Sequence, residues 1–149
     1  MSAWCSGAHL ARRFVGSLSP APPEPAGERW AQDQLLPGEV ALWRQMSNVD
    51  RRHAIQVAQR FIGVRATATR DETAAALLHD IGKLESNLGT LARVAATVVG
   101  PRTVRFRRYH DHERIGAEML VRAGSTPATV ELVRRHGPAA AALARADDI

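Results

Sequence analysis

The sequence predicts an all-α domain, a bundle of about six or seven helices. Apolar residues recur at helical spacing from about Glu28 onward, glycine or proline separates the periodic segments, and no segment alternates like a half-buried strand. A chain of 149 residues is long enough for one core, and a second domain is not expected. Residues 1–27, with a proline-rich stretch, are a poor core former, so we expect a flexible N-terminal arm (1–27) before one helical domain (28–149).

Each expected helix has a start or stop signal of its own. Pro37-Gly38 breaks the first periodic segment, Pro127 stands at a first helical position, and Gly82 and Gly124 follow periodic runs as stop signals. The expected helices are Glu28 or Pro37 to Met46, Val49 to Phe61 after a Ser47/Asn48 cap, Asp71 (as cap) to Asp80, Ser86 to Val98, Asp111 to Ala123, Thr126 (as cap) to His136, and an alanine-rich last helix after Pro138.

The composition indicates a basic surface. The net charge is +5, the sequence pI is near 10.9, and all but one of the 20 lysines and arginines are arginine. Such a surface attracts phosphate-bearing ligands. A GC-rich coding background would explain the arginine bias equally well, but the one lysine, Lys83, falls inside the strongest motif of the chain.

Cysteine usage and hydropathy limit the location and the metal chemistry. The lone Cys5 cannot form an internal disulfide and excludes cysteine-based zinc sites. No apolar run reaches the length of a membrane span, and the N-terminus lacks the apolar core of a secretory signal, so we expect a cytoplasmic protein. Any metal ion must therefore be held by histidine and carboxylate.

Histidine and aspartate are placed as a metal site would need them. His79 and Asp80 are neighbours at the end of a predicted helix, about 100° apart around its axis, so both can point toward one cleft. Val49, His53, Val57 and Phe61 follow at four-residue steps, which turns His53 inward. Imidazole and carboxylate together suit Fe, Mn, Zn or Mg.

The segment Leu77-Leu78-His79-Asp80-Ile81-Gly82-Lys83 resembles the signature of the HD-domain superfamily of metal-dependent phosphohydrolases, in its HDIG form. The likeness extends over residues 49 to 148, because His53, the His79-Asp80 pair and Asp147 follow the family's order and approximate spacing. His112 and His136 resemble the further histidines of members with two metal ions. The resemblance implies an HD-domain-like helical bundle.

The resemblance also implies an activity. His53, His79, Asp80 and Asp147 would hold one divalent ion, and Asp80, His112 and His136 a second, with Asp80 as the bridge. A metal-activated water would attack phosphorus, and Lys83 would hold a phosphate oxygen. The substrate would be a phosphoester of a nucleotide or a related small phosphorylated molecule. Which metal binds, whether one ion or two, and the oligomeric state stay open.

The sequence departs from the family's pattern at two points, which bear on the expected substrate and on the expected metal ligands. The branch that cleaves cyclic dinucleotides carries a paired His-His and a Gly-Tyr-Pro element, whereas this chain has His136-Gly137-Pro138, so that substrate is not supported. The chain also stops two residues after Asp147, which leaves Asp148 as an alternative ligand.

Two other classes of function compete with hydrolysis. In one, the HD-type site is catalytically silent and binds a nucleotide or a partner as a regulatory module. In the other, the basic arm and the arginines from Arg102 to Arg108 form an RNA-binding accessory, which an aromatic content of 5% disfavours because few rings remain for base stacking.

Overall fold

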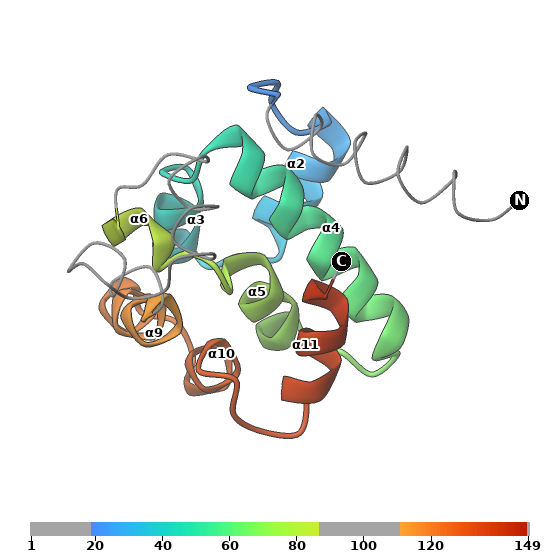
Figure 1. The fold of residues 1–149 in the computed structure, drawn as a ribbon, viewed down its shortest axis with the longest axis vertical. Helices are drawn as coiled ribbons and strands as arrows, with labels where there is room; N and C mark the ends of the chain where they lie inside the picture. The colour runs from blue at the N-terminus through green and yellow to red at the C-terminus, as the bar shows by residue number, and fades with distance from the viewer. Residues whose placement is uncertain (1–18, 87–110, 149) are drawn as a thin grey trace, which may run out of the picture.

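The computed structural model describes residues 19–86 and 111–148, and these residues form helices without a β-strand (Figure 1). The predicted all-α class is therefore confirmed. The helices are α2 (Pro25–Asp33), α3 (Pro37–Trp43), α4 (Asn48–Val64), α5 (Arg70–Leu78), the four-residue α6 (Lys83–Ser86), α9 (His112–Ala123), α10 (Pro127–Val133) and α11 (Ala140–Asp147).

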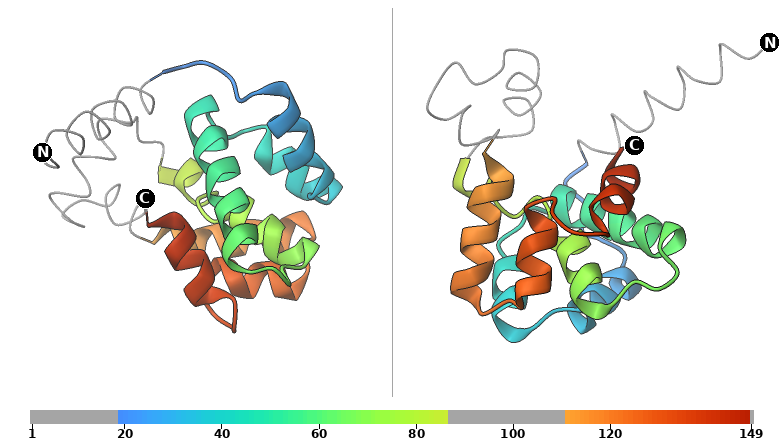
Figure 2. Two further views of the ribbon diagram at one scale, coloured as in Figure 1. Left: turned by 90° about the vertical axis from the view of Figure 1, so that its right-hand side faces the viewer. Right: turned by 90° about the horizontal axis from the view of Figure 1, so that it is seen from below.

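The fold brings segments from both ends of the described chain around α5. Helix α5 packs between α4 and α10, α11 lies along α4, and α6 lies against α9 (Figures 1 and 2). From Thr73 to Leu78 every residue of α5 is buried, so this helix is the centre of the core. The C-terminal end of α5 therefore lies in the middle of the bundle, close to α4 and α11.

The first helix starts earlier than the sequence pattern indicates. Helix α2 begins at Pro25, because proline fits the first turn of a helix, where its missing N–H would be unpaired in any case. The residues before it run along α4, where Asn48 Nδ2 donates to the carbonyl of Pro20 at 2.8 Å and Arg52 Nη2 donates to the carbonyl of Ser19 at 2.6 Å. The expected start of the next helix, Ser86, is the last residue of α6. Residues 87–98 of that expected helix and the arginines at 102–108 fall outside the described residues.

Several predicted helix ends are confirmed, but the predicted cap of α5 is wrong. Ser47 caps α4, Thr126 caps α10, and Gly124 closes α9 in a left-handed conformation with φ of 82°. Asp71 does not cap α5. Thr69 does, because its hydroxyl accepts from the N–H of Glu72 while the Glu72 side chain accepts from the N–H of Thr69, a reciprocal box that leaves Asp71 inside the first turn.

Gly82 has a different role from the predicted helix stop. Helix α5 ends earlier, at Leu78, with His79 as its C-cap, and Gly82 does not adopt a left-handed conformation. Its importance is close packing: a Cβ atom there would lie 1.9 Å from the carbonyl oxygen of His112. Only glycine lets the chain after Asp80 approach the start of α9 this closely.

Among residues 19–86 and 111–148, no helix combines the length and the apolar character that crossing a lipid bilayer requires.

Candidate metal centre

Helix α4 supplies His53. Val57 and Phe61, one and two turns further along the same face, are fully buried in the core. His53 continues this face to the edge of the core, where its side chain is 39% exposed. The predicted inward orientation is therefore seen, with the imidazole at the boundary between core and solvent.

His79 is the most deeply placed polar residue of the site. It is fully buried, and its Nδ1 atom lies 2.8 Å from the carbonyl oxygen of Ala76. A carbonyl can only accept, so Nδ1 carries the proton and donates. The ring is thereby oriented with Nε2 toward His53 and the end of α11, which is how metal-binding histidines are usually held.

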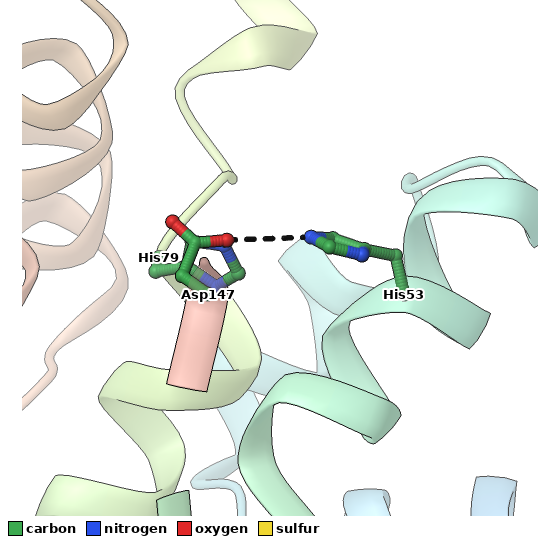
Figure 3. A group of neighbouring side chains, drawn as sticks. All are labelled: His53, His79 and Asp147. Carbon is green, nitrogen blue, oxygen red and sulfur yellow. Dashed lines mark hydrogen bonds and ion pairs between the residues drawn. The ribbon is translucent and has the colours of Figure 1, made fainter. Parts of the chain in front are cut away.

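Asp147 joins the two imidazoles from the last turn of α11. Its Oδ1 atom lies 3.2 Å from Nε2 of His79 and 3.4 Å from Nε2 of His53. Figure 3 shows the three side chains approaching one another from α4, from the end of α5 and from α11. Their ligand atoms all lie within 4.8 Å of one another, so one cation could contact all three. Asp147, rather than the following Asp148, makes these contacts.

Asp80 extends the cluster toward α9. Its Oδ2 atom lies 3.5 Å from Nε2 of His79, and its Oδ1 atom lies 3.4 Å from Nε2 of His112, at the start of α9. Lys83 pairs with the same carboxylate. Asp80 thus presents different oxygens to different histidines, an arrangement compatible with a bridging carboxylate.

The charges of the cluster favour ionised carboxylates. Burial raises the pKa of Asp80, but the charges of His79 and Lys83 outweigh it and lower the pKa to about 2. Burial also raises the pKa of Asp147, yet hydrogen bonds from His53 and His79 bring it well below its usual range. Burial lowers the pKa of His79, and the carboxylates of Asp80 and Asp147 more than offset this, so its net pKa is raised.

His136 lies apart from this group. Its side chain is 67% exposed, and its Nδ1 atom lies 3.5 Å from Glu131. Helix α10 ends at Val133, short of the predicted end, and the turn that follows directs Arg135 to the site instead. Arg135 Nη2 donates to Oδ2 of Asp147 at 2.7 Å. Arg135 is one arginine among many in the sequence, so no motif distinguishes it.

An open pocket of about 550 Å³ adjoins the centre. Asp147 belongs to both, so the pocket opens beside the centre. Its lining residues are Glu113, Arg135, Ala140, Ala144, Asp147 and Asp148.

Comparison with known families agrees with this geometry. A family model described as HD domain matches residues 51–145, well over half of the chain. The chain belongs to the HD domain family, part of a superfamily of metal-dependent phosphohydrolases. No curated protein and no solved structure matches the chain.

The residues present fit a divalent cation. Two imidazole nitrogens and carboxylate oxygens converge, and the second nitrogen of the buried imidazole is already bonded to a carbonyl. Among the described residues, the ligands of the cluster are imidazoles and carboxylates, without a thiolate. This ligand set is compatible with Mn, Fe, Mg or Zn and does not select one of them.

Proposed function

We propose that this protein is a metal-dependent phosphohydrolase that cleaves a phosphoester of a nucleotide or a related small phosphorylated molecule. The observation that carries the proposal is the convergence of His53, His79 and Asp147 from three helical segments on one point, with Asp80 alongside. Family membership adds the reaction class, because HD domains belong to metal-dependent phosphohydrolases.

Some of these side chains would bind a cation, and one would bind a phosphate oxygen. His53, His79, Asp80 and Asp147 would be the ligands of one ion, and Asp80 with His112 would begin the site of a second. A divalent cation would act as a Lewis acid on a phosphoryl oxygen and make water acidic enough to attack near neutral pH. The ammonium of Lys83, beside Asp80, supplies a positive charge for a phosphate oxygen.

The protonation of the chain's own groups suits this division. His79 donates from Nδ1 to the carbonyl of Ala76, so Nε2 is the nitrogen that faces a cation, and a bound cation would take the place of the proton that Nε2 shares with Asp147. Asp80, with a pKa of about 2, is a carboxylate at neutral pH and can accept without first losing a proton.

The proposal is tested by phosphatase and phosphodiesterase assays with added Mn²⁺, Fe²⁺ or Mg²⁺, on p-nitrophenyl phosphates and on nucleoside monophosphates. We expect metal-dependent turnover in the wild type and a loss of at least about 100-fold in Asp80→Asn, which keeps the size of the side chain. Glu85→Gln is the matched control, because Glu85 is exposed and pairs with Arg122 away from the centre. Equal turnover in Asp80→Asn and the wild type would refute the assignment.

The same assays, combined with a binding measurement, distinguish the hydrolase from the regulatory alternative. Nucleotide binding by calorimetry, together with no hydrolysis under any of the metals, would identify the chain as a silent HD-type binding module.

A further inference from the structure

Arg135 has an unusual backbone conformation. Its φ is 62°, and among the described residues it is the one non-glycine residue with a positive φ. The turn is a Schellman motif: the N–H of His136 donates to the carbonyl of Glu131 at 3.0 Å, and the N–H of Arg135 donates to that of Leu132 at 2.9 Å. Arginine therefore occupies the left-handed position where glycine is usual.

The same chain shows the unstrained form of this turn after α9. There the N–H of Ser125 donates to the carbonyl of Leu120 at 3.0 Å, the N–H of Gly124 donates to that of Val121 at 3.2 Å, and the left-handed position is held by Gly124. A side chain in this conformation costs free energy that glycine avoids. A benefit from the Arg135 side chain would explain why arginine is found there.

The side chain of Arg135 reaches the centre. Its Nη2 atom lies 2.7 Å from Oδ2 of Asp147, and its Nε atom lies 3.3 Å from Oε1 of Glu113. The opposite oxygen of Asp147, Oδ1, is the one that faces His53 and His79. The guanidinium thus holds one carboxylate oxygen and leaves the other directed at the imidazoles, and it connects the end of α11 to α9.

From these contacts we infer that Arg135 is a positioning residue for the metal centre, which fixes the carboxylate of Asp147 so that Oδ1 is presented to the cation. The inference rests on the proposed metal site, and it does not depend on which substrate is cleaved. The left-handed turn after α10 is the backbone feature that delivers the guanidinium to Asp147.

The test is Mn²⁺ titration by calorimetry on the full chain. Melting temperatures recorded in EDTA check that each variant is folded without metal. In Arg135→Gly the backbone is relaxed and the guanidinium is lost, so we expect an Mn²⁺ affinity about tenfold or more below that of the wild type. Arg134→Gly is the matched control, because Arg134 pairs with Glu131 on the exposed side of the turn. Its affinity should stay near that of the wild type.

Arg135→Lys provides a second measurement, since lysine keeps a cationic donor within reach of Asp147. Its Mn²⁺ affinity should lie between those of Arg135→Gly and the wild type. A wild-type affinity in Arg135→Gly, an equal loss in Arg134→Gly, or a lysine variant as weak as the glycine variant would each overturn the inference. Absence of Mn²⁺ binding by the wild type would instead refute the metal site itself.

Discussion

Nε2 of His79 lies 3.2 Å from Oδ1 of Asp147, although the two residues are 68 positions apart in the chain. The contact exists because α5 ends in the middle of the bundle and α11 lies along α4, which places the last turn of α11 over the end of α5. A buried imidazole facing a carboxylate, with His53 beside both, is the basis of the proposed metal site.

Asp147→Asn tests whether this carboxylate is a ligand. Because the amide keeps the size of the side chain but loses its charge, Mn²⁺ affinity should fall by at least about 100-fold. The rise in melting temperature on adding Mn²⁺ should disappear in the same variant. Asp148→Asn is the matched control and should retain both properties; the reverse pattern would make Asp148 the ligand.

His112 and His136 should respond differently to substitution. His112 lies 3.4 Å from a carboxylate oxygen of Asp80, whereas His136 is 67% exposed and contacts Glu131. We expect His112→Ala to lower metal-dependent turnover about tenfold or more, and His136→Ala to leave it unchanged. Steady-state assays at saturating Mn²⁺ measure both. A loss in His136→Ala equal to that in His112→Ala would contradict the described geometry.

Gly82→Ala should destabilise the fold. The new Cβ would lie 1.9 Å from the carbonyl oxygen of His112, so α9 or the turn must shift, at a cost of about 3 kcal/mol in the free energy of unfolding. Gly63→Ala is the control, because its Cβ meets no atom within 4 Å in helix α4, where alanine should add about 0.5 to 1 kcal/mol. Urea denaturation measures both, and equal effects would contradict the close approach.

Asp71 should make stability depend on pH. A hydrogen bond from Thr126 lowers the pKa of Asp71 below its unfolded value, burial opposes this, and Arg70 adds to the lowering. A folded-state pKa below the unfolded one stabilises the fold above the unfolded pKa, and this stabilisation is lost as the pH falls through the folded pKa. Asp71→Asn should therefore cost about 1 kcal/mol at pH 7 and progressively less as the pH falls below the ordinary carboxyl pKa of 3.8, measured by urea denaturation. A cost independent of pH would contradict the ionised hydrogen bond.

The helices were accessible from sequence because their signals are local. Ser47, Thr126 with Pro127, and Gly124 act on the turn in which they stand, and the structure has each helix boundary there. The predicted N-cap of α5, Asp71, is wrong. Threonine and aspartate both form N-caps, so the residue types alone do not decide between Thr69 and Asp71. The choice depended on Glu72 closing a reciprocal box with Thr69.

The part of the site that follows a motif was also predictable, whereas the part that depends on tertiary geometry was not. The resemblance to the HD-domain signature identified His53, His79, Asp80 and Asp147, and the structure brings these residues together. The contact of Arg135 with Asp147 and the exposed position of His136 both occur at the left-handed turn after α10, which no sequence motif marks. An arginine at a left-handed position, where glycine is usual, cannot be recognised from the sequence, because the chain contains many other arginines.

The central claim is that the chain holds a divalent cation between His53, His79 and Asp147. Elemental analysis of protein purified without chelator tests it most directly, with the His53→Ala variant carrying Asp147→Asn as the comparison. The account predicts a stoichiometric transition metal or magnesium ion in the wild type and its loss in the double variant. A wild type that contains no such ion, and takes up none from Mn²⁺, Fe²⁺, Mg²⁺ or Zn²⁺, would contradict it.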